Sequence, residues 1–139
     1  MDANDKKRNA AKAALEFIEP GTILGVGTGS TVNFLIEMLP GIRDRIDRLV
    51  SSSIASTVLL EANGFEVATL NETGDLDLYI DGADESNKRL ELIKGGGGAL
   101  TTGYNEERVF YARKKIDQIR ATGAKMIVVP CHSCHGQFN

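Results

Sequence analysis

Residues 81–100 contain the side chains best suited to chemistry, in the order DGADESNKRLELIKGGGGAL. Asp81 and Asp84 are separated by two small residues, and their ionised carboxylates can accept hydrogen bonds from sugar hydroxyls. Lys94 offers three N–H donors and a positive charge to an oxyanion, and the glycine run after it can turn successive backbone N–H groups toward the same anion. The segment therefore predicts a loop that holds a polyhydroxylated, phosphorylated ligand, although either motif in isolation is more often a solvated surface loop.

A second candidate element lies at residues 21–31, GTILGVGTGST. A short apolar run there is typical of a buried strand, and we expect Ser30 or Thr31 to cap a helix that starts near Val32. A strand, a glycine turn and a helix N-terminus form the usual geometry for binding phosphate, because the first N–H groups of a helix have no partner within it.

The same spacing excludes nucleotide cofactors. The turn is not G-x-x-x-x-G-K-[ST], and Gly25, Gly27 and Gly29 alternate instead of following G-x-G-x-x-G. A dinucleotide site also needs an acidic residue about 20 positions further on. The second strand is expected to end instead in the serines 51–53. No cofactor is therefore expected.

The hydrophobic pattern alternates between helices and strands along the chain. Helices are expected at 5–18, 32–39, 55–62 and 106–122, and strands at 22–26, 48–52, 65–70, 76–81, 90–93 and 125–129. Pro40-Gly41 and Asn63-Gly64 are expected to end two of the helices. This order predicts an α/β fold, a three-layer, Rossmann-like arrangement with a mostly parallel sheet and helices on both faces. Ligands bind such sheets beyond the carboxyl ends of the strands, where the glycine turn, the serines and the DGAD segment all fall.

The C-terminal segment has a different character. In the helix expected at 106–122, one apolar stripe is formed by Val109, Ala112, Ile116 and Ile119. Cys131, Cys134 and His135 then have the C-x-x-C-H spacing of haem attachment. We expect neither haem, because no export signal is seen, nor a complete metal site, because these ligands with His132 are too close together for a good tetrahedron.

Composition limits the class of protein further. The 139 residues carry a formal charge of −3, which favours neither nucleic acid nor membrane binding. No apolar run approaches the roughly 18 residues that a membrane span requires. Two clustered cysteines do not make a disulfide framework. We expect one cytoplasmic domain over residues 1–139, and the sequence leaves open whether it forms a homo-oligomer.

Four motifs together resemble one family. VGTGST at 26–31, VSSSIAS at 50–56, DGADE at 81–85 and KGGGGAL at 94–100 match, in order and spacing, ribose-5-phosphate isomerase of the A type over residues 6–101. The resemblance implies a Rossmann-like domain that interconverts ribose 5-phosphate and ribulose 5-phosphate without metal or nucleotide. It also implies a substrate site made of a lysine near the N-terminus and three loops: Lys7, Thr28, Gly29, Ser30, Thr31, Asp81, Gly82, Ala83, Asp84, Lys94, Gly95, Gly96 and Gly97.

The catalytic position departs from the family. Its base is a glutamate shortly after the glycine run, in a context like KGGGGALTREK, whereas this chain reads KGGGGALTTGYNEER and has Gly103 at that position. Glu106 and Glu107 are the nearest carboxylates, and they would reach the site only if the loop took a changed path. Their other interpretation is as acidic residues in the first turn of a helix. In the implied reaction Asp81 or Asp84 handles hydroxyl protons, and Lys94 stabilises the oxyanion of an enediolate.

From about residue 102 the chain no longer follows that family. The segment 102–139 weakly resembles the cysteine-rich parts of iron–sulfur or heterodisulfide-reductase-like subunits, as a fusion, a truncated gene or a chimera would. Two alternatives to an isomerase therefore stay open. One is a non-catalytic sugar-phosphate-binding or chimeric domain, and the other is a redox or metal-binding protein that uses Cys131 and Cys134.

Overall fold

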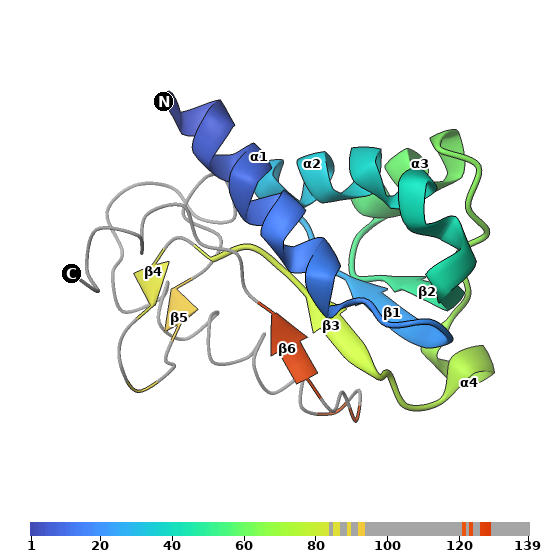
Figure 1. Ribbon diagram of the computed structural model, residues 1–139. Coiled ribbons are helices and arrows are strands. Elements are labelled where there is room, and N and C mark those ends of the chain that lie inside the picture. The colour runs from blue at the N-terminus through green and yellow to red at the C-terminus, as the bar shows by residue number, and fades with distance from the viewer. Residues whose placement is uncertain are drawn as a thin grey trace.

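The computed structural model describes residues 1–83, 85, 86, 89, 92, 93, 121, 123 and 126–128. Four strands form a sheet in the order β2-β1-β3-β6 (Figure 1), namely β1 (Thr22–Val26), β2 (Ile46–Ser51), β3 (Leu78–Ile80) and β6 (Met126–Val128). Every neighbouring pair in this sheet is parallel. Strands β4 (Glu85–Ser86) and β5 (Leu92–Ile93) pair separately and antiparallel. The order places β1 between β2 and β3, so the turn after β1 is flanked by the ends of both.

The helices are α1 (Ala3–Ala14), α2 (Ser30–Met38), α3 (Ile54–Ala62) and the short α4 (Leu70–Thr73), with 3₁₀ turns η1 (Leu15–Phe17) and η2 (Leu39–Arg45). Helix α1 begins at a capping box, in which Asp2 and Asp5 each accept a hydrogen bond from the backbone N–H of the other. Its alanines at 11 and 14 are buried, so the helix can approach its neighbours closely.

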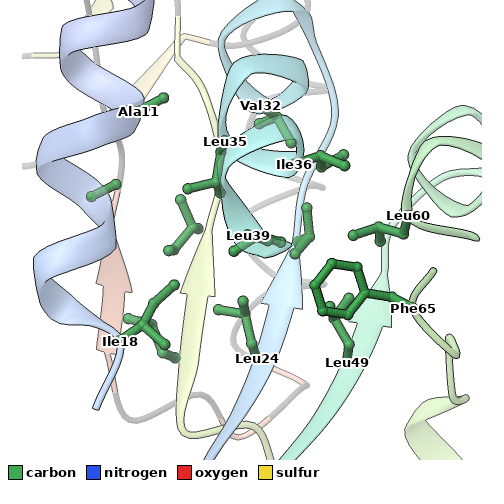
Figure 2. Packing of buried hydrophobic residues seen from close by; sticks show 14 residues of the cluster. Ala11, Ile18, Leu24, Val32, Leu35, Ile36, Leu39, Leu49, Leu60 and Phe65 are labelled. Carbon is green, nitrogen blue, oxygen red and sulfur yellow. The ribbon is translucent and has the colours of Figure 1, made fainter. Parts of the chain in front are cut away.

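One face of the sheet carries the main core. Helices α1, α2 and α3 lie together on that face (Figure 1). Leu24 of β1 and Leu49 of β2, partners in the parallel register, point toward the helices, where Leu35 and Ile36 of α2 meet them (Figure 2). All four side chains are at most 2% exposed. Apolar residues recur in α2 at helical spacing because this face must be buried.

The opposite face carries a smaller buried cluster of Val50, Leu76 and Tyr79, with Ile23 packed against it. Period-2 alternation explains the division, since Ile23 and Leu24 of β1 point to opposite faces. The fold is therefore α/β and Rossmann-like, as the sequence predicted. The helix expected at 106–122, with its stripe of Val109, Ala112, Ile116 and Ile119, lies outside the described residues except for its end.

The strand predicted at 65–70 is wrong. Only an isolated bridge between Val50 and Ala68 joins this segment to the sheet. Leu70 instead begins α4, because Thr69 and Glu72 form a second capping box that uses the local backbone donors. The exposed Glu72 has a pKa below its usual range, because the Thr69 backbone N–H and hydroxyl donate to its carboxylate.

The other elements lie near their expected positions. Strand β1 has the expected bounds, and β3 and β6 are shorter than expected. Helix α2 starts two residues early, at Ser30, and after Met38 the chain continues as η2 through Pro40 and Gly41 instead of turning away. Among the described residues, no helix combines the length and the apolar character that crossing a membrane requires.

Candidate functional site

The turn between β1 and α2 is held at the carboxyl edge of the sheet by its neighbours on both sides. The N–H of Gly27 donates to the carbonyl of Ile80 in β3 at 2.8 Å, and the N–H of Ser52 after β2 donates to the carbonyl of Val26 at 3.0 Å. The glycine turn, the serine segment and the start of the DGAD loop therefore meet at one place. The rule for open parallel sheets predicted this meeting from the sequence.

The three alternating glycines at residues 25, 27 and 29 are required for two different reasons. A Cβ on Gly25 would lie 2.7 Å from the Tyr79 ring, and a Cβ on Gly27 would overlap the Asp81 carboxylate. Only Gly29 needs conformational freedom, because its φ of 122° is disfavoured for residues with a side chain. The alternation therefore reflects close approach to β3 at two positions and chain reversal at the third.

Asp81 is the centre of a buried hydrogen-bond network. Its side chain is only 2% exposed. Oδ1 accepts from the backbone N–H of Thr28 at 3.1 Å and of Gly82 at 2.8 Å, and Oδ2 accepts from the Tyr79 hydroxyl at 2.9 Å. The carboxylate thus joins the end of β3 to the glycine turn. The sequence analysis did not predict this structural role. Its predicted action on substrate hydroxyls stays a prediction.

The Tyr79 phenol remains a hydrogen-bond donor over a wide pH range. Burial raises its pKa above the usual value, and the nearby negative charge of Asp81 raises it further. The phenol is therefore protonated at neutral pH and keeps its O–H directed at Asp81. Tyr79 was not among the predicted site residues. Its position two residues before Asp81 in a strand was the available signal, because residues i and i+2 lie on the same side.

Helix α2 presents its N-terminus at this edge without a side-chain cap. The N-cap residue is Gly29, so the prediction that Ser30 or Thr31 caps the helix is wrong. Both are the first helical residues instead, with Ser30 exposed and Thr31 buried. The first intrahelical bond runs from the N–H of Asn33 to the carbonyl of Gly29, so the N–H groups before it have no partner inside the helix. Such donors, together with the helix dipole, suit an anion.

Lys7 lies at the same end of the molecule. Helices α1 and α2 begin at one end of the sheet, with Ala11 of α1 level with Val32 of α2 (Figure 2). The guanidinium of Arg8 lies 5.1 Å from the centre of the Phe34 ring, which joins the two helices. Lys7 is half-buried and precedes Ala11 by one helical turn, so this arrangement is compatible with its predicted contribution to the pocket.

The structure brings only part of the predicted site together. Lys7, the residues 28–31 and the residues 81–83 are described, with Gly82 half-buried and Ala83 buried. The other predicted residues lie outside the described part of the chain: Asp84, Lys94, Gly95, Gly96, Gly97, Gly103, Glu106, Glu107, Cys131, Cys134 and His135. Among the described residues, no group of three or more histidine, cysteine or acidic side chains is placed to hold a metal ion.

Comparison with known proteins connects this geometry to one family. Residues 48–116 match the family model of ribose 5-phosphate isomerase A (phosphoriboisomerase A). Ribose-5-phosphate isomerase A of Acidithiobacillus ferrooxidans is 54% identical over 101 residues, which is 73% of this chain and 46% of that protein. The protein of the same name from Legionella pneumophila is 54% identical over 98 residues, covering 70% and 45%. The isomerase-like part of this chain is similar to ribose 5-phosphate isomerase A.

Solved structures of the isomerase A family share the fold. That of ribose 5 phosphate isomerase A from Neisseria gonorrhoeae has a TM-score of 0.73 at 37% identity, over 92% of this chain and 51% of that one. A D-ribose-5-phosphate isomerase in complex with phospho-erythronic acid has a TM-score of 0.71 at 31% identity, over 93% and 52%. The chain thus spans about half the length of the isomerase A relatives that it matches.

A second family model matches the C-terminal segment. Residues 95–139 match a model described as cysteine-rich domain. This agrees with the sequence resemblance of residues 102–139 to cysteine-rich segments. The two matched ranges overlap at residues 95–116, which include Gly103 and Glu106. The match to a second family supports the inference that the chain leaves the isomerase pattern in this region.

Proposed function

We propose that this chain binds ribose 5-phosphate at the carboxyl edge of its sheet and acts on it as an aldose–ketose isomerase. The observation that carries the proposal is the uncapped N-terminus of α2, held by a glycine turn whose path Asp81 fixes. Identity of 54% to proteins named ribose-5-phosphate isomerase A supports this substrate. The complex of a related isomerase with phospho-erythronic acid, a phosphorylated sugar acid, supports the same ligand class.

In this proposal the ligand's phosphate lies at the N-terminus of α2, near Ser30 and Thr31, with Lys7 contributing positive charge. The sugar hydroxyls lie toward the DGAD loop, and Lys94 with the glycines after it faces the reacting carbonyl. A carboxylate removes the C2 proton of the open-chain aldose, an enediolate forms, and the proton returns at C1. Positive charge and backbone N–H groups stabilise the oxyanion that develops. None of these steps needs a cofactor.

The proposed reaction needs a carboxylate as its catalytic base, and the chain lacks one at the expected position. The position that matches the family's base is Gly103, and the next carboxylates in the chain are Glu106 and Glu107. We therefore propose tight enough binding to be measured, together with slow turnover. We also propose that the protein is cytoplasmic and that it binds neither nucleic acid nor a membrane.

Calorimetric titration tests the binding. Ribose 5-phosphate should bind with a millimolar or lower Kd, and unphosphorylated ribose should bind much more weakly. Lys94→Ala should weaken binding of ribose 5-phosphate by about 1.5–3 kcal/mol, the range for a charge-assisted hydrogen bond, because the donor to the carbonyl oxygen is lost. Lys12→Ala, at an exposed position of α1, is the matched control and should change nothing. Equal binding of ribose and ribose 5-phosphate would contradict a phosphate site.

A further inference from the structure

One peptide unit of the glycine turn is held from both of its ends by side chains of different elements. The hydroxyl of Ser56, in the first turn of α3, donates to the carbonyl oxygen of Gly27 at 2.6 Å. The N–H of Thr28, the other end of the same peptide unit, donates to Asp81 Oδ1 at 3.1 Å. Because a peptide unit is planar, fixing its oxygen and its N–H fixes the orientation of the whole unit.

Both holding side chains are themselves fixed. Ser56 is 1% exposed, and its backbone N–H donates to the hydroxyl of Ser53, the N-cap of α3, at 3.1 Å. The Asp81 carboxylate is held on its other side by the Tyr79 hydroxyl at 2.9 Å. The Asp81 carboxylate cannot follow a rotating peptide without straining its buried bond to Tyr79. The bond from the Ser56 N–H to Ser53 holds the backbone that carries the Ser56 hydroxyl. The arrangement is therefore a rigid clamp that consists of Ser56, Asp81 and Tyr79.

The clamp acts next to the proposed anion site. The Gly27–Thr28 peptide directly precedes Gly29, whose positive φ turns the chain into α2. A rotation of that peptide would be passed on to the backbone that leads to the first N–H groups of the helix. Misplacement of about 1 Å in a binding group can cost a hundredfold in rate. A buried carbonyl left without a donor would itself favour such a rotation.

We propose that Ser56 is a positioning residue of this site: through the Gly27–Thr28 peptide, and against Asp81 held by Tyr79, it sets the direction of the donors at the N-terminus of α2. The inference deepens the proposed function and rests on it for its ligand. Ser56 touches no substrate in this proposal. Its effect passes through the backbone.

The test compares Ser56→Ala with Thr57→Val, the matched control. Thr57 also donates its hydroxyl to a backbone carbonyl, that of Ser53 at 3.0 Å, but this bond stays within the start of α3. Removal of the Ser56 hydroxyl should raise the Kd for ribose 5-phosphate by about tenfold or more, as expected for a buried hydrogen bond. The control should bind like the unmodified chain. Ser56→Cys keeps the volume and a weak donor, so its Kd should lie between the two and it covers the case in which Ser56→Ala does not fold.

A second measurement separates this inference from the proposed function. Amide hydrogen exchange at Thr28 reports the clamp without any ligand, and Ser56→Ala should speed it more than exchange at Leu24 or Leu35 in the core. If the unmodified chain binds no ribose 5-phosphate, the proposed function fails, while faster exchange at Thr28 still supports the clamp. Unchanged Thr28 exchange, or an unchanged Kd in a folded Ser56→Ala protein that binds the ligand, would overturn the clamp.

Discussion

At the scale of single residues, the site is determined by contacts of one buried carboxylate. Asp81 accepts hydrogen bonds from Thr28, Gly82 and Tyr79, and it occupies the space that a side chain at residue 27 would need. A buried carboxylate is tolerated only when it is hydrogen-bonded in this way. The Asp81 carboxylate therefore explains why residue 27 is a glycine and why a hydroxyl donor is present at residue 79.

Replacement of Gly27 by alanine should be costly. The new Cβ would overlap the Asp81 carboxylate, which its three donors prevent from moving away. We expect a loss of about 1–3 kcal/mol in the free energy of unfolding, the usual cost of overpacking, and loss of ribose 5-phosphate binding. Gly41→Ala is the control, because a Cβ there meets nothing within 4 Å. Urea denaturation of both variants measures the difference, and equal midpoints would contradict the close approach.

The raised pKa of Tyr79 predicts a loss of stability in alkali. Because the folded protein holds the phenolic proton more tightly than the unfolded chain, this contribution is complete below the ordinary tyrosine pKa of about 10 and is lost as the pH rises beyond it. The free energy of unfolding, measured by urea denaturation, should therefore fall above about pH 10.

The variant Tyr79→Phe should lower stability at neutral pH, because Asp81 loses a donor. It should also show a smaller fall between about pH 9 and pH 11 than the unmodified chain, since the titrating group is gone. The slope against pH is the decisive quantity. An identical slope in both proteins would show that other groups cause the alkaline loss.

At the scale of elements, η2 and α3 are joined by one arginine. The Arg43 guanidinium donates to the carbonyls of Asn63 and Gly64, each at 2.8 Å, and lies 4.1 Å from the centre of the Phe65 ring. These carbonyls stand at the C-terminal end of α3, where acceptors lack helical partners and a positive charge is favourable. The contact fixes where α3 ends and where the chain turns back toward the sheet.

Arg43→Lys should therefore not behave as a conservative change. Lysine keeps the charge but lacks the planar group that bonds two carbonyls while it stacks on the ring. Because the side chain is exposed, we expect a modest loss of about 0.5–1.5 kcal/mol in the free energy of unfolding. Arg45→Lys, at another exposed position of η2, is the control and should be within error of the unmodified chain. Thermal denaturation distinguishes the two, and a neutral Arg43→Lys would show that charge alone suffices.

At the scale of the whole molecule, the chain combines parts that match two families. Its isomerase-like part matches relatives of which it covers less than half, and its last 45 residues match a cysteine-rich domain. The sheet nevertheless continues past the isomerase motifs, because β6 at residues 126–128 pairs with β3. A parallel strand at that position lies within the range of the second match and extends the layer that the first part began.

The departure from the isomerase pattern after the glycine run should affect the catalytic rate more than the fold. Because the sequence resemblance matches Gly103 to the family's glutamate, we expect the chain to isomerise ribose 5-phosphate at least about a hundredfold more slowly than a relative with that base. Gly103→Glu should recover part of the rate if the backbone after Leu100 follows the family's path. A ribulose 5-phosphate assay measures both. Fast turnover by the unmodified chain that Glu106→Gln or Glu107→Gln abolishes would instead identify a relocated base.

The sequence alone predicted the α/β class, the bounds of β1 and the meeting of three loops at one sheet edge. Strand and helix periodicity are local properties, and parallel strands of this order bring their carboxyl ends together. Phosphate binding at residues 28–31 stays a prediction, drawn from the local pattern of a glycine turn before a helix. Local reasoning failed where a cap competed with pairing, at residues 65–70, and where the glycine itself took the N-cap position.

Only the tertiary structure showed why each glycine is needed and what holds the turn. Asp81 and Thr28 are 53 residues apart, and Ser56 and Gly27 are 29 apart. No local pattern of residue types encodes those two hydrogen bonds, because they exist only after β3 and α3 have packed beside β1. Ser56 has the same appearance in the sequence as its neighbouring serines. Its burial and its distance to the Gly27 carbonyl give it a role that composition and spacing do not indicate.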